Sequence, residues 1–280
     1  MPELWGVLNV TPDSFSDGGK YLEPGAAIDH GRRLLQDGAE VLDIGGESSR
    51  PAGRAYGEGF DEVPAVEEIR RVVPVIEVLA GRLGARVSID TVKPEVATAA
   101  LAAGASVVND VRCARDPALA KVAAARGADY VIMHNRGRGE ARSPNTDYGD
   151  VVEDVLAELL AAAERVERAG VPRASVWLDP GLGFAKTAAQ SAELLSSLGR
   201  FRKTGYRVLV GPSRKSFIAE LAPNPGGEPP PVDDRLGGTA AAVAICVAAE
   251  VDAVRVHDVF VMRQLIRVTQ ALHEAGGGAR

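Results

Sequence analysis

The sequence predicts a single α/β domain folded as a (β/α)8 TIM barrel with its active site at the C-terminal ends of the strands. Its 280 residues fit such a barrel, which takes about 250 residues, with little left over. Eight short apolar runs alternate with longer amphipathic segments, and this order predicts parallel strands joined by right-handed helical crossovers. A doubly wound open sheet is the alternative that spacing alone leaves open, although no GxGxxG motif follows the first strand.

The predicted strands are short and mostly rich in Val, Ile or Leu, as expected of strands buried on both faces. They cover residues 4–10, 41–44, 87–89, 107–108, 130–133, 176–178, 208–210 and 253–256. The predicted helices cover residues 26–36, 65–83, 94–103, 116–126, 150–169, 190–200, 239–249 and 259–274. Proline near helix starts, as at Pro64 and Pro94, and glycine after helix ends, as at Gly127 and Gly170, support these assignments.

Three loops interrupt the alternation, at residues 11–20, 45–59 and 223–234. The first two follow the first and second strands directly, which places them at the C-terminal rim of a barrel. We expect one domain over residues 1–275 and a disordered tail at 276–280.

Composition narrows the function classes. Lys+Arg 32 against Asp+Glu 38 gives a net charge of −6, which argues against nucleic acid as a partner. Only Cys113 and Cys246 are present, so a disulfide framework is not expected and a reducing cytoplasm is the default location. The N-terminus does not read as a secretory signal, and the most apolar stretch, 239–249, is too short to span a bilayer, so we expect no membrane association.

Polar or charged side chains stand at the ends of nearly all predicted strands. In a barrel of parallel strands these ends converge on one rim, where barrel enzymes hold their active sites. Any one of these groups alone is more readily explained as a cap or a satisfied buried polar group, but together they indicate a site. They are Asn9, Asp43 inside its strand, Glu47, Asp90, Asn109, Asp110, His134, Asp179, Arg214, Lys215, Arg255, His257 and Asp258.

The mixture of groups indicates the kind of ligand. Acceptors at Asp90, Asn109 and Asp179 suit a nitrogen-rich heterocycle with an amino group and ring N–H donors. Positive charge at Arg255 and His257, with Arg50, suits a phosphate or carboxylate. Lys215 is either a charge clamp or an activated amine. The alternative for Arg255 and His257 is a structural salt link to Asp258 or Asp252.

Several other chemistries are disfavoured. Residues 179–187 end in Lys-Thr and contain two glycines, but Ala185 precedes Lys186, so the phosphate-loop pattern is not met. We interpret the segment as a tight turn with Phe184 free to stack on a flat ligand. His134 has no HxxxH or HxH partner and no CxxC occurs, which argues against zinc. No GxSxG elbow is present, and no sequence feature marks Cys113 as a nucleophile.

Eight segments at strand ends together carry a resemblance over almost the full chain. They are residues 6–19 (GVLNVTPDSFSDGG), 43–51 (DIGGESSRP), 88–91 (SIDT), 109–111 (NDV), 133–134 (MH), 179–184 (DPGLGF), 213–216 (SRKS) and 255–258 (RVHD). In these motifs the chain resembles the bacterial dihydropteroate synthase family, the pterin-binding enzymes of folate biosynthesis that sulfonamides target.

The resemblance implies a transferase reaction and a set of roles. 6-Hydroxymethyl-7,8-dihydropterin diphosphate would condense with 4-aminobenzoate to give 7,8-dihydropteroate and diphosphate. By similarity, Asp90, Asn109, Asp179 and Lys215 hold the pterin, Asn9 contacts Mg²⁺, and Ser49, Arg255 and His257 lie at the diphosphate. Phe15, Ser16 and Asp17 belong to a first mobile loop and Ser49, Arg50 and Pro51 to a second, while Pro51, Phe184, Lys215 and Ser216 line the aminobenzoate pocket.

The catalytic assignments implied are Asp90, Asp17 and Lys215. A carboxylate at Asp90, with Asp17, would favour the incipient pterin cation, and metal with cations would neutralise the leaving diphosphate. A lone Asn9 suffices for Mg²⁺ because this ion often keeps waters and phosphate oxygens as its other ligands.

The chain departs from the family pattern in three places. Ser49 stands where the family often has Thr, and Ala52-Gly53 displaces the usual Gly after Pro51 within a longer loop. Gln190-Ser191 stands where a His-Asn pair is often found.

The alternatives in function are a folate-dependent methyltransferase domain and a non-catalytic pterin binder. Family members are usually homodimers; residues 239–249 and the last helix are candidate contacts, although close helix–barrel packing explains the Ala-rich face better.

Overall fold

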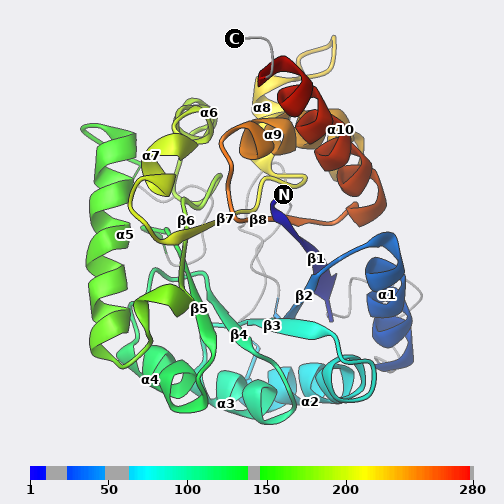
Figure 1. Cartoon of the computed structure of the whole chain (residues 1–280), viewed down its shortest axis with the longest axis vertical. Coiled ribbons are helices and arrows are strands. Elements are labelled where there is room, and N and C mark those ends of the chain that lie inside the picture. Colours follow the sequence, from blue (N-terminus) through cyan, green and yellow to red (C-terminus); the bar gives the residue numbers. More distant parts are fainter. Residues whose placement is uncertain (11–23, 48–62, 138–145, 278–280) are drawn as a thin grey trace.

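A closed barrel of eight parallel strands forms the centre of the molecule, and helices surround it (Figure 1). The computed structural model describes residues 1–10, 24–47, 63–137 and 146–277. Each strand pairs with the next in sequence, and β1 pairs with β8, which confirms the predicted barrel and excludes the open sheet. The strands are β1 Glu3–Asn9, β2 Val41–Gly45, β3 Arg86–Asp90, β4 Val107–Asp110, β5 Asp129–Met133, β6 Val176–Asp179, β7 Arg207–Val210 and β8 Ala253–Val256.

Helices follow the strands as predicted, with differences in detail. They are α1 Pro24–Asp37, α2 Ala65–Ile76, η2 Glu77–Arg82, α3 Pro94–Ala102, α4 Pro117–Arg126, α5 Val151–Arg168, η3 Arg173–Ser175, α6 Ala188–Ser196, α7 Leu198–Arg202, α8 Ser216–Leu221, η4 Val232–Arg235, α9 Leu236–Ala248 and α10 Val259–Gly277. The predicted helix 65–83 changes to wider π turns at Glu77, three residues after Pro74, which cannot donate to the helical ladder. The predicted helix 190–200 is broken at Ser197, whose ψ of 13° separates α6 from α7.

Two further differences concern a short extra helix and the length of the last helix. The short helix α8 was not predicted, because six residues carry too little periodicity to be recognised. Helix α10 continues to Gly277, so the first two residues of the expected tail are helical, and residues 278–280 lie outside the described part.

Side chains inside the barrel form layers. At the N-terminal end lies an apolar plug of seven fully buried residues, Trp5, Val41, Val107, Val131, Trp177, Leu209 and Ala253. The rings of Trp5 and Trp177 meet edge to face, with centroids 5.4 Å apart. Because side chains alternate along a strand, the residues two positions further on also point inward, one layer nearer the C-terminal rim.

The outer core lies between the barrel and its helices. Small residues bring elements close together, as on α9, where a Cβ on Gly238 would lie 2.2 Å from Ile218 Cγ2 of α8. Through this contact α9 supports the helix that begins one residue after Lys215. Within the described residues, no helix combines the length and the apolar character needed to cross a membrane.

Candidate active site

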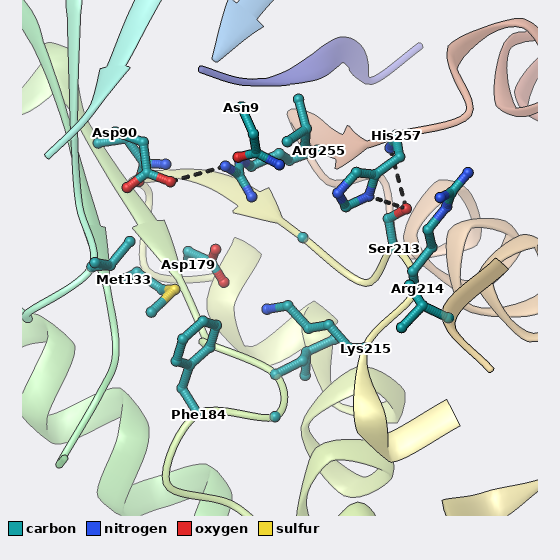
Figure 2. A pocket seen from close by; sticks show the side chains of 17 residues that line it. Asn9, Asp90, Met133, Asp179, Phe184, Ser213, Arg214, Lys215, Arg255 and His257 are labelled. Carbon is teal, nitrogen blue, oxygen red and sulfur yellow. Dashed lines mark hydrogen bonds and ion pairs between the residues drawn. The ribbon is translucent and has the colours of Figure 1, made fainter. Parts of the chain in front are cut away.

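A pocket opens at the C-terminal rim, where six strands and the loops after them contribute side chains (Figure 2). Its position follows from the layers of the barrel. Two residues after the plug positions Val107, Trp177 and Ala253 come the pocket residues Asn109, Asp179 and Arg255. The pocket is lined by eight of the predicted site residues: Asn9, Asp90, Asn109, Asp179, Phe184, Lys215, Arg255 and His257.

The floor of the pocket is a network around Arg255. Its guanidinium pairs with Asp43 through Nε and with Asp90 through Nη2, the latter at 2.9 Å. Asn109 Nδ2 donates to Asp43 Oδ2 at 3.1 Å. Strand pairing sets this arrangement, because Asp90 and Asn109 are register partners on β3 and β4. Asp43 Oδ1 and Asn109 Oδ1 are buried and have no hydrogen-bond partner among the described residues, which leaves acceptors at the floor.

Burial shapes the ionisation of this floor. It raises the pKa of Asp90, with Asp43 adding to the shift, while the guanidinium of Arg255 opposes it. Although burial acts to lower it, Asp43 and Asp90 together raise the pKa of Arg255, so this cation is permanent. Asp43 was counted among the polar groups of the predicted rim but was given no role; its place two positions after the plug residue Val41 is the signal that could have assigned it to the floor.

A second wall combines Asp179, Phe184 and Lys215. Asp179 Oδ1 accepts a hydrogen bond from Gly181 N at 2.7 Å and so closes the turn after β6. Gly181 has a φ of +66°, and a Cβ there would lie 1.9 Å from His134 O, so only glycine fits. Lys215 Nζ lies 4.6 Å from the centre of the Phe184 ring. Burial lowers the pKa of Lys215 to about 8, and Asp179 opposes that shift.

The third side of the pocket carries His257. Ser213 Oγ lies 3.0 Å from His257 Nδ1 and accepts from His257 N at 3.2 Å, which fixes the ring (Figure 2). Arg214 forms a bidentate pair with Asp258, at 3.0 and 2.6 Å, and has a φ of +59°. Arg255 pairs with Asp43 and Asp90. The alternative considered for it, a salt link to Asp258 or Asp252, is not the ion pair observed.

Other rim residues have structural roles. Asp110 accepts from Arg112 N, Ala114 N and Tyr130 Oη, which is the capping role expected of a lone polar residue. Glu47 pairs with Lys93, which also binds the buried Glu68 at 2.7 Å.

The residues at one departure from the family pattern, Gln190 and Ser191, have clear partners. Gln190 completes a capping box with Thr187 at the start of α6 and donates to Thr146 O at 2.9 Å. Ser191 Oγ accepts from Gly183 N at 3.1 Å, so it supports the backbone beside Phe184.

Six predicted site residues need separate mention. Ser216 opens α8 next to Lys215 and is not among the residues found to line the pocket in the described part of the chain. Phe15, Asp17, Ser49, Arg50 and Pro51 lie outside the described residues, as do Ser16 and the Ala52-Gly53 departure.

A barrel rim that joins buried carboxylates, an amide, an ammonium and a guanidinium defines an enzyme that binds a polar heterocycle carrying an anionic group. Residues 5–257 match the family described as "Pterin binding enzyme". The chain belongs to this family.

Named relatives agree with the family. The dihydropteroate synthase of Synechocystis sp. is 41% identical over 96% of this chain and 89% of its own length. A probable bifunctional folylpolyglutamate synthase/dihydropteroate synthase of Haloferax volcanii is 44% identical over 91% of this chain, which spans 29% of that longer protein. Solved structures of the Xanthomonas albilineans dihydropteroate synthase contain 4-aminobenzoic acid or 7,8-dihydropteroate; they are 40% and 39% identical, with TM-scores of 0.86 and 0.83, covering 97% of this chain and 93% and 94% of theirs.

Proposed function

We propose that the chain catalyses the dihydropteroate synthase reaction, in which 6-hydroxymethyl-7,8-dihydropterin diphosphate and 4-aminobenzoate give 7,8-dihydropteroate and diphosphate. The observation that carries the proposal is one pocket that joins the acceptors Asp90, Asn109 and Asp179 to the cations Lys215 and Arg255. Relatives that share about 40% of their residues with nearly the whole chain carry the same name. The chain is thus a transferase of folate biosynthesis.

The pterin binds at the floor. Its amino group and ring N–H groups are donors, and they match the carboxylates of Asp90 and Asp179 and the free oxygen of Asn109. Buried acceptors of this kind discriminate strongly against ligands that lack matching donors, since such a ligand would leave the acceptors unpaired.

The bond between the pterin methylene and the diphosphate oxygen breaks, and diphosphate leaves with the electron pair. Positive charge then develops on the pterin, and the carboxylate of Asp90 stabilises it from the floor. We propose the same role for Asp17. Arg255 and His257, with Ser49, bind the departing diphosphate. The amino nitrogen of 4-aminobenzoate forms the new bond to the methylene and loses one proton.

We propose Mg²⁺ as the cofactor, held by Asn9. The fit rests on the donor set: an amide oxygen on the pocket wall is a hard ligand, and Arg255 and His257 line the same pocket where diphosphate oxygens would complete the coordination. Among the described residues no cluster of three or more His, Cys, Asp or Glu could hold a metal by itself. When bound, Mg²⁺ neutralises charge on the leaving group.

The aryl substrate binds at the outer wall. An aromatic ring with a carboxylate matches the Phe184 ring and the Lys215 ammonium 4.6 Å from it. We propose that Ser216 and Pro51 complete this wall, and that Phe15 and Arg50 act from the two loops to exclude water from the cation.

We also propose a cytoplasmic homodimer. Exposed apolar side chains on the packed helices α9 and α10, namely Ile245, Val268 and Leu272, support a contact between two copies there. Light scattering coupled to size-exclusion chromatography tests it, and a monomer at micromolar concentration would refute it.

The function is tested by incubating the purified protein with the pterin diphosphate, 4-aminobenzoate and Mg²⁺. We expect 7,8-dihydropteroate and diphosphate in equal amounts, measured by mass spectrometry and a coupled diphosphate assay. A methyltransferase domain or a non-catalytic pterin binder would release no diphosphate, and that result would reject the proposal.

A further inference from the structure

A buried lysine lies directly behind the pocket wall and has no part in the reaction described above. Lys186 is 5% exposed and is not among the residues that line the pocket. The turn before it is strained, because Ala185 has a φ of +48°, which is unfavourable for a residue with a Cβ. Tyr148 Oη donates to Ala185 O at 3.0 Å and so supports this turn. A strained backbone with a lysine turned inward requires compensating contacts.

Those contacts form a chain of three side chains. Lys186 Nζ lies 2.9 Å from His134 Nδ1, and His134 Nε2 lies 3.1 Å from Glu158 Oε2. Glu158 Oε1 in turn accepts from Arg136 Nε at 2.8 Å. The polarity of the chain follows: Lys186 donates to Nδ1, and a neutral imidazole with its proton on Nε2 donates to the carboxylate.

Burial, with Lys215, lowers the pKa of Lys186 to about 7, and its amine keeps N–H donors for His134 Nδ1 in either protonation state. The ionisation of the other two groups is consistent with that polarity. Burial, with Lys186, lowers the pKa of His134 to about 4, so the imidazole is neutral. The hydrogen bond from His134 lowers the pKa of Glu158 to about 2, so the carboxylate is charged.

The same ammonium also holds the backbone of the pocket wall. Lys186 Nζ donates to Phe184 O at 2.9 Å. The Phe184 side chain is among those that line the pocket (Figure 2), and Lys186 is not. Asp90 and Asn109, by contrast, belong to β3 and β4 and are fixed by strand pairing and by Arg255 and Asp43. Lys186 therefore holds the Phe184 backbone by a hydrogen bond, and no hydrogen bond joins it to Asp90 or Asn109; on Asp179 it acts through its charge alone.

We propose that Lys186, oriented by His134 and Glu158, is a positioning residue for 4-aminobenzoate that acts through Phe184. The inference rests on the proposed function, because it assigns the Phe184 wall to the aryl substrate. Loss of the amine releases the Phe184 peptide, so the ring samples positions that no longer match the aryl ring, while the pterin acceptors Asp90 and Asn109 keep their own partners.

The test is a set of variants assayed with both substrates. Lys186→Met keeps the length of the side chain and removes the donor. Lys121→Met, at an exposed position on α4, is the matched control. We expect Lys186→Met to raise KM for 4-aminobenzoate about tenfold, equivalent to one lost hydrogen bond, while the affinity for the pterin diphosphate changes by a clearly smaller factor. Glu158→Gln changes the half-exposed end of the Lys186–His134–Glu158 chain of hydrogen bonds, and it should raise the same KM by a smaller factor. This variant keeps the proposal testable if Lys186→Met does not fold.

A double-mutant cycle shows whether the effect passes through Phe184. Phe184→Leu alone should raise KM for 4-aminobenzoate, and adding Lys186→Met to it should raise KM little further. Additive effects, an equal loss of pterin affinity, or unchanged KM values in Lys186→Met and Glu158→Gln would each overturn the proposal. If the wild-type protein and Lys121→Met form no dihydropteroate, the proposed function itself is wrong, and this outcome is distinct from the others.

Discussion

Single side chains at the pocket floor act because the fold removes them from water. Asp90 is 9% exposed and shares Arg255 with Asp43, so its charge is directed at whatever lies above the floor. Lys215 is placed by the start of α8 and faces Asp179 and Phe184. Neither group needs to reorient when charge develops on a bound ligand, which is the condition for electrostatic catalysis.

Removing either group should therefore cost transition-state stabilisation. We expect Asp90→Ala and Lys215→Ala each to lower kcat/KM about a hundredfold, which corresponds to about 3 kcal/mol of lost transition-state stabilisation, as for the loss of one preorganised electrostatic group. Steady-state kinetics at saturating Mg²⁺ measures this, with Lys121→Ala as the control. Turnover close to that of the wild type in either variant would contradict the assignment.

His134 makes the stability of the protein depend on pH. Its pKa is about 4 when folded because of burial, against an ordinary value of 6.5. Between these values the unfolded chain binds the proton and the folded one does not, so the free energy of unfolding falls as pH falls from 6.5 to 4. A shift of this size corresponds to about 3 kcal/mol.

We expect His134→Gln to lose much less stability than the wild type between pH 6.5 and 4, measured by urea unfolding at several pH values. His273→Gln, at an exposed position on α10, is the control and should follow the wild type. Parallel pH profiles for His134→Gln and the wild type would show that another group carries the acid sensitivity.

At the scale of the elements, α9 supports the helix that positions Lys215. Gly238 lies against Ile218 of α8, and a Cβ there would be 2.2 Å from Ile218 Cγ2. Gly237, its neighbour on the same helix, has no atom within 4 Å of an added Cβ.

These neighbours give a matched pair. Gly238→Ala should lower the free energy of unfolding by about 1–3 kcal/mol through overpacking, whereas Gly237→Ala should raise it by about 0.5–1 kcal/mol because alanine favours the helix. Chemical denaturation measures both, and adding Ile218→Ala to Gly238→Ala should restore part of the loss. Equal effects at the two glycines would show that the close contact is not what matters.

The elements also show what sequence reasoning can reach. All eight strands and their order were predicted, because each is a short apolar run next to a helix with its own stop signals. The break at Ser197, the π turns after Pro74 and the short α8 were not, since tertiary packing decides them rather than local periodicity. In the site, the residues at strand ends were found, but no role was assigned to Asp43 or Lys186, because the partners Arg255 and His134 are 212 and 52 residues away in sequence.

Over the whole molecule, stability and function occupy opposite ends of the barrel. The apolar plug around Trp5 and Trp177 fills the N-terminal end, and the pocket begins one layer above it. We expect Trp5→Ala to lower the free energy of unfolding by about 3–5 kcal/mol.

The same variant, assayed well below its unfolding temperature, should keep kcat/KM within about twofold of the wild type, since only groups that contact substrate change transition-state binding directly. Urea unfolding and steady-state kinetics on one preparation give both numbers. A large loss of kcat/KM with unchanged stability would show that the plug tunes the pocket.

Arg255 meets two carboxylates before any ligand arrives. A guanidinium already neutralised in this way attracts a pyrophosphate tail less than a bare one would, so the by-product is held loosely and can depart. One guanidinium against two carboxylates leaves a net negative charge, and this charge favours a positively charged ring above the floor. The three groups Arg255, Asp43 and Asp90 thus stabilise the cationic intermediate more than they stabilise bound diphosphate.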